Sequence, residues 1–430
     1  MTKTSRVSLV LTTALTACML LGAPATTMAQ TSPSTDDLQK KIDDLQKQIS
    51  DLKAAMAPAP APAAATPAAA PAAAPAAPTI GSLLGPTTLS GFVDVYAGYN
   101  GNQPATRTNG PLRNFDVQTG QFGLNMIELI ADKALDATAG RVGYHVSLGF
   151  GQAMNLVNSS ETNFDQYLKE GYLDYLVGKK LTVTVGKFVT PAGAEVIESK
   201  DNWNYSRGDL FTLAIPYFHF GASAKYAFNS KFALTGYLVN GWNNSIDNNT
   251  GKTFGFSAAY TPSAKFSIIE NLLIGPEHAN YNGSMRRLSD TVISWNPTAK
   301  LSLMANYDYG YDHFVSGSIP PIVTLGAAKW SGLAGYLKYA PSAKWYLAVR
   351  SEYYDDNQGF QTGFLPPGIE MNETTFTLQR ILAKSLITRL EVRYDSADQK
   401  IFEDHASGFT SSNQTTATLG LIYAFTTAPQ

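Results

Sequence analysis

The chain has 430 residues, of which 15% are charged and 44% hydrophobic, and its formal net charge at pH 7 is −2. This near-neutral balance argues against a nucleic-acid partner, which requires a basic face. After the first thirty residues, no stretch is apolar over the roughly 18 residues that a membrane-spanning helix needs. A long chain that is poor in charge and rich in Gly (35 residues) and Tyr (22 residues) favours an extended β protein.

Residues 1–29 have the pattern of a secretory signal peptide. Lys3 and Arg6 precede an apolar run, and the small residues of "TMAQ" predict cleavage after Ala29. An alternative interpretation is that "LTAC" is a lipoprotein processing box in which Cys18 becomes acylated. We favour ordinary cleavage because the apolar core continues beyond Cys18, and the mature chain would then contain no cysteine.

Residues 30–56 predict a short coiled coil. Apolar side chains recur there at alternating spacings of four and three residues, which is typical of heptad positions a and d. These seam residues are Leu38, Ile42, Leu45, Ile49, Leu52 and Met56. Ile at a with Leu at d favours two strands, although the attached domain can impose three. A lone amphipathic surface helix is the alternative, but so narrow a seam in so polar a helix fits self-association better.

Residues 57–87 form an Ala/Pro-rich linker. Pro recurs every few residues between 57 and 78, so no helix can propagate there. A segment of this composition is a semi-rigid, polyproline-like spacer. At about 3.1 Å per residue it would reach on the order of 70 Å. We expect it to separate the oligomerising segment from the rest of the chain.

From about residue 88, the chain consists of short segments with period-two alternation. The segments "VGYHVSLGF" (142–150) and "LITRLEVRYD" (386–395) alternate apolar residues with small or charged ones. This pattern is typical of strands with one apolar and one more polar face. Because soluble sandwiches and membrane barrels both show it, alternation alone leaves the choice between them open.

Loop length distinguishes the two fold classes. Short turns lie at 136–140, 178–180, 229–231, 262–265, 297–300, 341–344 and 383–385, and three of them share nearly the same sequence ("TPSAK", "NPTAK" and "APSAK"). Longer polar loops alternate with them, at 101–120, 190–216, 311–326, 355–370 and 396–415 among others. Short turns on one rim and long loops on the other are typical of outer-membrane barrels. Seven turns join fourteen strands, and one strand at each terminus predicts an all-β, transmembrane antiparallel barrel of about sixteen strands over residues 88–430.

Aromatic residues flank several of these short turns. They are Tyr226, Phe228, Phe232, Tyr260, Phe266, Trp295, Tyr339 and Trp345. Tyr and Trp favour the headgroup level of a bilayer, so their recurrence predicts a girdle at the periplasmic rim. The strand propensity of aromatic residues is the alternative explanation.

Several short Gly-rich or aromatic segments occur in a specific order. They are "GFVDVYAGYN", "VGKFVTPAGAEVIES" followed by "NYSRGDLF", "YFHFGASAKYAF", "YLVNGWNN" and "ANYDYG". Together these segments resemble the beta-barrel porin-2 (OmpL-like) family of outer-membrane proteins, over most of residues 88–425. The resemblance implies a bacterial outer-membrane channel. The coiled-coil start is also similar to the arrangement of phosphate-selective porins, which are trimers.

The longest loop, 190–216, is the predicted constriction of the channel. Its apolar residues favour folding into the lumen, whereas an exterior loop with solvated charges is the alternative. Mixed charges inside a channel would set a transverse field that orients polar solutes. The charged candidates are Glu195, Glu198, Lys200, Asp201, Arg207 and Asp209.

Strand parity assigns a second set of charges to the lumen wall, because Arg or Lys facing lipid at the midplane costs about 2–4 kcal/mol. This set is Glu170, Asp174, Arg350, Glu352, Arg389, Glu391 and Arg393. Arg389 and Arg393 share one face and suggest a basic ladder for anions. Glu391 lies between them on that face, so a structural ion pair is the favoured interpretation. Parity leaves Glu270 and Arg380 unassigned.

We therefore expect an outer-membrane porin, embedded in lipid as a homotrimer, through which small hydrophilic solutes or ions diffuse. No catalysis, metal or other cofactor is expected, because the five His residues are scattered and no phosphate-binding glycine loop occurs. Two alternatives remain. One is an anion- or phosphate-preferring porin, against which the near-neutral charge counts. The other is a barrel-anchored tether whose periplasmic N-terminal segment contacts the cell wall or a periplasmic partner.

Overall fold

The structure is a computed structural model that describes Lys47 and residues 85–138, 140–319, 321–364, 368–405 and 408–428. The predicted signal peptide and coiled-coil seam lie outside these residues, as does the Ala/Pro linker up to residue 84. The chain divides into two units, Met1–Thr79 and Ile80–Gln430. The architecture below is that of the second unit.

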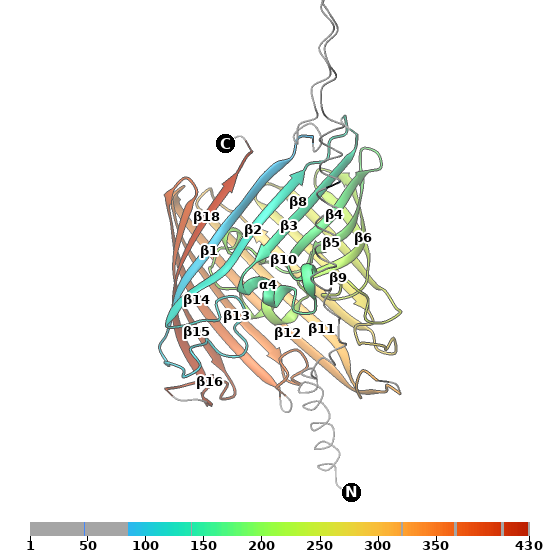
Figure 1. The fold of residues 1–430 in the computed structure, drawn as a ribbon. Coiled ribbons are helices and arrows are strands. Elements are labelled where there is room, and N and C mark those ends of the chain that lie inside the picture. The colour runs from blue at the N-terminus through green and yellow to red at the C-terminus, as the bar shows by residue number, and fades with distance from the viewer. Residues whose placement is uncertain are drawn as a thin grey trace, which may run out of the picture. The chain divides into compact units, whose positions relative to one another are not determined.

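Sixteen of the described strands form one closed antiparallel barrel (Figure 1). Each strand pairs with its neighbours along the chain, and β1 closes the barrel by pairing with β18. The barrel strands are β1 (Thr88–Asn100), β2 (Gln121–Lys133), β3 (Val142–Phe150), β4 (Leu168–Leu176), β5 (Leu181–Val189), β6 (Phe218–Asn229), β7 (Phe232–Val239), β8 (Thr253–Ser263), β9 (Phe266–Gly275), β10 (Arg286–Trp295), β11 (Leu301–Val315), β12 (Thr324–Ser342), β13 (Trp345–Asp356), β14 (Ile369–Ala383), β15 (Leu386–Ala397) and β18 (Asn413–Thr426). The predicted fold class and strand number are thus confirmed.

The remaining described elements lie in the loops. A two-stranded sheet of β16 (Phe402–Glu403) and β17 (Phe409–Ser411) lies between β15 and β18. The described helices are α4 (Gln152–Val157), η2 (Asn163–Gln166), η3 (Ser199–Asp201) and η4 (Leu210–Ala214). None of these helices has the length and apolar character needed to cross a membrane.

The two rims of the barrel differ as the turn lengths predicted. All seven short turns join strands at the rim where β1 begins and β18 ends, since Ser90 pairs with Thr426. The long loops, including 190–216, begin and end at the opposite rim, where their strands end. Each repeated Pro-containing segment is therefore a tight connection within one rim. Pro262 and Pro341 lie within β8 and β12, at register shifts that precede the two-residue turns at 264–265 and 343–344.

The barrel is apolar outside and polar inside. In β15, Leu390, Val392 and Tyr394 are 52%, 44% and 47% exposed, whereas the alternate residues Arg389 and Glu391 are buried. Since successive side chains of a strand point to opposite faces, the sequence alternation places its leucines in the bilayer and its charges in the lumen.

Register shifts interrupt this alternation at several points of the described sheet, and two of them change the direction of buried polar residues. Between Ser147 and Leu148 of β3 the register of β4 shifts, so Lys169 is an extra residue in its strand. Asn125 of β2 is an extra residue in the same way, opposite Asp94. A bulge re-aims side chains, and both Lys169 and Asn125 lie buried in the interior. Simple parity from the neighbouring residues would misplace them.

The structure also places the two charges that parity left unassigned. Arg380 lies near the short-turn rim on the outer face, with its guanidinium 4.9 Å from the ring centre of Trp345. Glu270 lies halfway along β9 on the face shared with the exposed Leu272. Its carboxylate accepts hydrogen bonds from Ser289 (2.7 Å) and Thr291 (2.5 Å). The barrel therefore presents one carboxylate at mid-height on its outer wall.

Candidate functional site: the lumen and its folded-in loop

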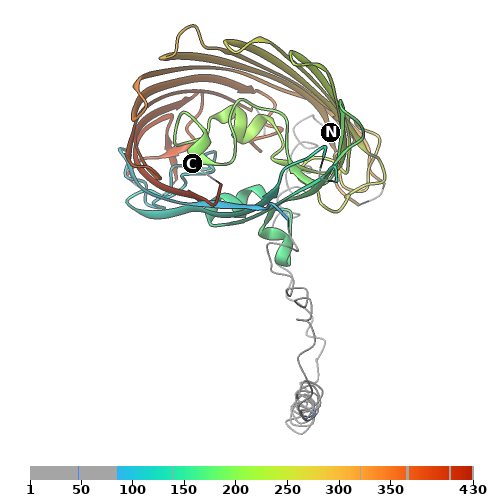
Figure 2. The same cartoon turned by 90° about the horizontal axis from the view of Figure 1, so that it is seen from above.

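The loop between β5 and β6 crosses the interior of the barrel. Figure 2 looks along the barrel and shows the green helical segments of this loop inside the ring of strands. It reaches β1, where Ser199 and Tyr205 donate hydrogen bonds to Asp94 (2.5 and 2.8 Å). It also reaches β12, where the Trp330 Nε1–H donates to the carbonyl of Ala214 (2.9 Å). The loop is thus fixed to walls that are far from its own strands in the sequence.

Arg350 on β13 lies where the loop docks against β13–β15, a contact region that we call the Arg350 junction. Its side chain is 0% exposed. The guanidinium donates to Glu195 of the loop (2.6 Å), to Glu373 of β14 (2.7 Å) and to the carbonyl of Ser206 (2.8 Å). A guanidinium offers five donors in a rigid plane, so one side chain connects two strands to two points of the loop.

Carboxylates of the wall bind the main chain of the loop. Glu391 accepts the N–H groups of Tyr205 (2.6 Å) and Ser206 (3.0 Å). Glu352 accepts the N–H of Asp209 (2.5 Å). These bonds satisfy buried backbone donors that belong to no strand or regular helix, and an unpaired donor of this kind is costly.

Arg389 and Arg393 are both engaged by the loop. Arg393 donates to Asp209 and to the carbonyl of Arg207, both at 2.7 Å. Arg389 donates to backbone carbonyls of the loop, namely those of Ser199, Lys200, Asn202 and Asn204. Both arginines are buried, so neither presents its guanidinium to a passing anion.

Three of the six predicted loop charges are buried in this junction: Glu195, Arg207 and Asp209. Burial raises the pKa of Asp209 to about 6, although the Arg393 guanidinium acts in the opposite direction. Burial also lowers the pKa of Arg207 from its usual value, against the attraction of Asp94. The Arg207 guanidinium lies 4.3 Å from the ring centre of Phe115, which shields it from water.

The other three loop charges lie elsewhere. Glu198 forms an ion pair with Lys169, which also contacts Glu128 at 2.7 Å. Lys200 and Asp201 pair with each other at 2.5 Å and keep part of their side chains exposed. Of the six predicted charges, therefore, these two retain the most contact with solvent.

Glu170 and Asp174 lie on β4, on the side of the barrel away from the Arg350 junction. Glu170 accepts the N–H of Val189 at the start of the loop (3.1 Å). Asp174 accepts a hydrogen bond from Thr184 (2.5 Å) and lines the open part of the lumen. The structure thus separates the predicted wall charges into five that contact the loop near β13–β15 and two on β4.

Sequence reasoning did not include several residues of the junction. Glu373 of β14 and Asp395 of β15 are buried at inward-facing positions of their strands. The same alternation that assigned Arg350 and Arg393 to the lumen could therefore have identified them. Asp94 is likewise on the inner face of β1. Lys169 carried no usable signal, because its inward direction depends on the β3–β4 bulge.

The open part of the lumen lies between the loop and the wall formed by β4–β9. A cavity of about 490 Å³ is bounded there by inward-facing residues of these strands and by Pro191 of the loop. Its lining is mostly hydroxyl-bearing, small or aromatic, and its charged members are Asp174 and Lys225. The strand residues that line it are Asp174, Thr182, Thr184, Ser223, Lys225, Ala233, Thr235, Tyr237, Ser257, Ala259 and Ile269.

The described residues contain no group of three or more His, Cys, Asp or Glu arranged to bind a metal ion. What they contain is a closed barrel with an apolar outer belt, a polar lumen and a loop folded into it. This combination of features is that of an outer-membrane porin. The family described as "Putative beta-barrel porin-2, OmpL-like" matches residues 86–425. The chain belongs to this family of porins.

Solved structures share the fold of this porin. The outer membrane channel DcaP of Acinetobacter baumannii is 11% identical, with a TM-score of 0.53 over 79% of this chain and 97% of that one. An anion-selective porin from Comamonas acidovorans is 14% identical, with a TM-score of 0.51 over 79% of this chain and 99% of that one. No curated protein matches the sequence. At these identities the likeness is one of fold.

Replacing Arg350 by Met should release the loop from the wall. Glu195, Glu352 and Glu373 would lose their shared cation, and removing one partner of a buried ion pair costs about 3–5 kcal/mol. We expect faster amide hydrogen exchange in residues 195–210 and a lower free energy of unfolding. Arg380→Met is the matched control, because Arg380 lies on the outer face beside Trp345. Unchanged exchange in the Arg350 variant would contradict the role assigned to this side chain.

Asp209→Asn should change how stability depends on pH. With a folded-state pKa of about 6, above the usual value near 4 for Asp, Asp209 favours the folded state less as pH rises through this window. The free energy of unfolding of the Asn variant should therefore increase relative to that of the wild type between about pH 4 and pH 6. Above about pH 6, the difference between the two should stay constant. Urea titrations across pH measure this difference, with Asp201→Asn as an exposed control. A difference that stays constant with pH would show that Asp209 titrates normally.

Proposed function

We propose that small hydrophilic solutes and ions cross this porin between the folded-in loop and the β4–β9 wall, by passive diffusion and without chemical change. The observation that supports this route is the cavity of about 490 Å³ bounded by Pro191 and the inner face of β4–β9. On the side of β13–β15 the loop is docked on the wall through the Arg350 junction, whose side chains are buried. A cavity of about 410 Å³ beside Lys200 lies at the short-turn rim on the β1–β18 side. We take the β4–β9 side as the route because its cavity is the one bounded by six consecutive strands and the loop.

The lining of this route favours weak selectivity. Asp174 and Lys225 are its charged residues, one of each sign. Lys225 has no ion-pair partner among the residues that the structure describes. The carboxylate of Asp174 accepts from Thr184. This balance supports a general porin more than an anion-preferring one, and we expect small reversal potentials in a salt gradient.

Two adjacent residues of β6 test the route. Ser223 lines the cavity, whereas Ala224 is exposed on the outer face. Ser223→Trp should reduce single-channel conductance by about half or more, because the indole would narrow the passage. Ala224→Trp should leave conductance unchanged, since Trp is tolerated against lipid near the interface. Equal conductance of the two variants in planar bilayers would exclude the proposed route, and the absence of any conductance steps from the wild type would exclude the porin function itself.

We also propose that the short-turn rim faces the periplasm and that residues 30–56 lie on that side. Short periplasmic turns and longer extracellular loops are the usual arrangement in outer-membrane barrels. Thr88, at the start of β1, lies at the short-turn rim. A chain that enters the barrel from this rim supports a periplasmic N-terminal segment.

We propose further that this porin is a homotrimer whose protomers cover Glu270. A carboxylate on the lipid-facing wall near mid-height is costly, which supports a protein neighbour there. In the register of the sheet, Glu270 lies beside Ala258 of β8 and Thr291 of β10. Small side chains let membrane segments approach closely, so this part of the wall is suited to packing against another barrel.

Spin labels on the outer wall test this assignment. A nitroxide at Ala258→Cys should be several-fold less accessible to oxygen dissolved in the bilayer than one at Leu390→Cys, because a neighbouring protomer would cover it. Leu390 is the control, as it is 52% exposed on the outer face of β15. Equal accessibility at the two positions would argue against an interface at Glu270. A monomeric mass in mild detergent would argue against the trimer.

A further inference from the structure

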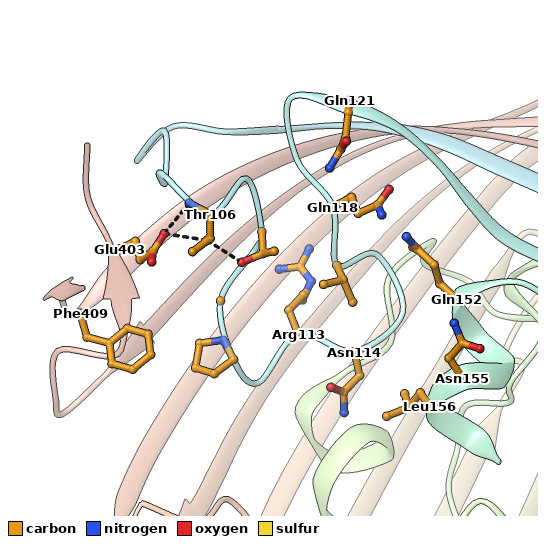
Figure 3. A pocket seen from close by; sticks show the side chains of 14 residues that line it. Thr106, Arg113, Asn114, Gln118, Gln121, Gln152, Asn155, Leu156, Glu403 and Phe409 are labelled. Atoms are coloured by element: carbon orange, nitrogen blue, oxygen red, sulfur yellow. Dashed lines mark hydrogen bonds between the residues drawn. The ribbon is translucent and has the colours of Figure 1, made fainter. Parts of the chain in front are cut away.

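A second cavity, of about 770 Å³, lies at the long-loop rim. Figure 3 shows it between the β1–β2 loop, the start of β2, helix α4 and the β16–β17 sheet. Five side-chain amides are among its lining residues: Asn114, Gln118, Gln121, Gln152 and Asn155. So many carboxamides around one cavity need an explanation beyond the general polarity of loops.

Tyr96 fixes two parts of this cavity relative to each other. Its hydroxyl donates to the Oε1 of Gln152 on α4 (2.9 Å) and accepts the backbone N–H of Gln118 (2.9 Å). Tyr96 itself is buried on the inner face of β1. The loop and the helix are therefore held at a defined separation by a rigid side chain of the barrel wall, and the cavity between them is largely preformed.

The hydrogen-bonding capacity of these amides is mostly unused, although the side chain of Asn114 is engaged with the hydroxyl of Tyr217. Within the described part of the chain, no hydrogen bond is made by the side chains of Gln118, Gln121 or Asn155. Gln152 uses its oxygen for Tyr96, which leaves its NH₂ group. A carboxamide offers two donors and one acceptor. The cavity therefore presents donors and acceptors side by side, which is the complement of a hydroxyl group that both donates and accepts.

Among the described lining residues, the one cation of this cavity is already ion-paired, and its one carboxylate is hydrogen-bonded by neutral groups. Arg113 donates to Asp116 and Asp395, both at 2.8 Å. Glu403 accepts from the hydroxyl of Thr106 (2.7 Å). The Arg113 guanidinium is therefore not available to an anion, which would lose hydration there without gaining a counter-ion. Glu403 keeps its negative charge, so glucosamine is the comparator that tests whether this carboxylate recruits a cation.

Apolar groups complete the lining. Phe409 of β17 is 50% exposed, and Leu156 of α4 and Pro111 of the β1–β2 loop also line the cavity. Binding sites for small molecules are typically cavities of about 300–1,000 Å³ with apolar surfaces and a few polar groups that fix orientation. A sugar ring has this dual character, since its C–H faces are apolar and its edge carries hydroxyls.

We propose that this cavity binds neutral polyhydroxylated solutes, in particular small saccharides, at the long-loop mouth of the barrel. The amides would hydrogen-bond the hydroxyl edge of the sugar, and Phe409 would cover one face of the ring. Saccharide binding at this cavity would precede diffusion through the barrel. It rests on the proposed function only because the bound solute would then pass through the lumen. Binding itself requires no transport.

Calorimetric titration of the purified full-length protein with maltose tests the proposal, with gluconate and glucosamine as charged comparators. The variants are Gln118→Leu/Gln121→Leu and, as a matched control, Asn372→Leu, whose amide is exposed on β14 outside the cavity. We expect maltose to bind the wild type and the control alike. Affinity of the double variant should be about tenfold lower, from the loss of two amides, and its conductance in salt should be unchanged.

Three results would overturn the proposal. These are no maltose binding to the wild type at millimolar concentration, unchanged affinity in the double variant, or tighter binding of either charged comparator. Conductance measured on the same preparations separates this outcome from a failure of the porin function. A wild type that conducts but binds no sugar refutes the capture site alone, and a double variant that conducts normally demonstrates that its barrel is folded.

Discussion

A strand inside a bilayer must pair both of its edges, because lipid offers no partners for backbone N–H and C=O groups. The sheet of this porin satisfies that constraint where β1 meets β18, eleven register pairs closing the ring from Ser90–Thr426 to Asn100–Thr416. Closure puts one face of every strand against lipid and the other into an interior. This division explains why apolar and polar residues alternate along the strands and why the charges face inward. It also explains why the longest loop can fold into the interior.

The strands alone do not fill the interior, and the loop between β5 and β6 occupies part of it, docked mainly on β11–β15. Where the loop is docked, the side chains are as buried as those in the core of a soluble protein, but many of them are charged instead of apolar. Arg350, Arg389 and Arg393 lie buried among carboxylates and loop carbonyls. A buried charge is tolerable only when it is paired and hydrogen-bonded, so the position of the loop and the ionisation of the wall depend on each other. The open part of the lumen, by contrast, is lined mainly by neutral side chains.

Much of this architecture could be predicted because its signals are local. Turn length identified the rims and the number of strands, and strand parity placed Arg350 and Arg393 on the inner face. The rest depends on contacts between distant segments. Lys169 points inward because of one extra residue relative to β3, which alternation cannot reveal. Nor does alternation say that Arg389 binds four loop carbonyls, or which part of the lumen the loop occupies, because those facts belong to the docked loop rather than to either segment alone.

The wall holds this loop largely through its main chain. Glu391 accepts two backbone N–H groups and Arg389 binds backbone carbonyls, and every residue except proline supplies both groups. Side chains at many loop positions can therefore be exchanged while the docking bonds persist. In such a barrel, the residues that maintain the fold and the residues that determine permeability can change independently. The segment bordering the passage is free to diversify toward new solutes without a new fold having to be found.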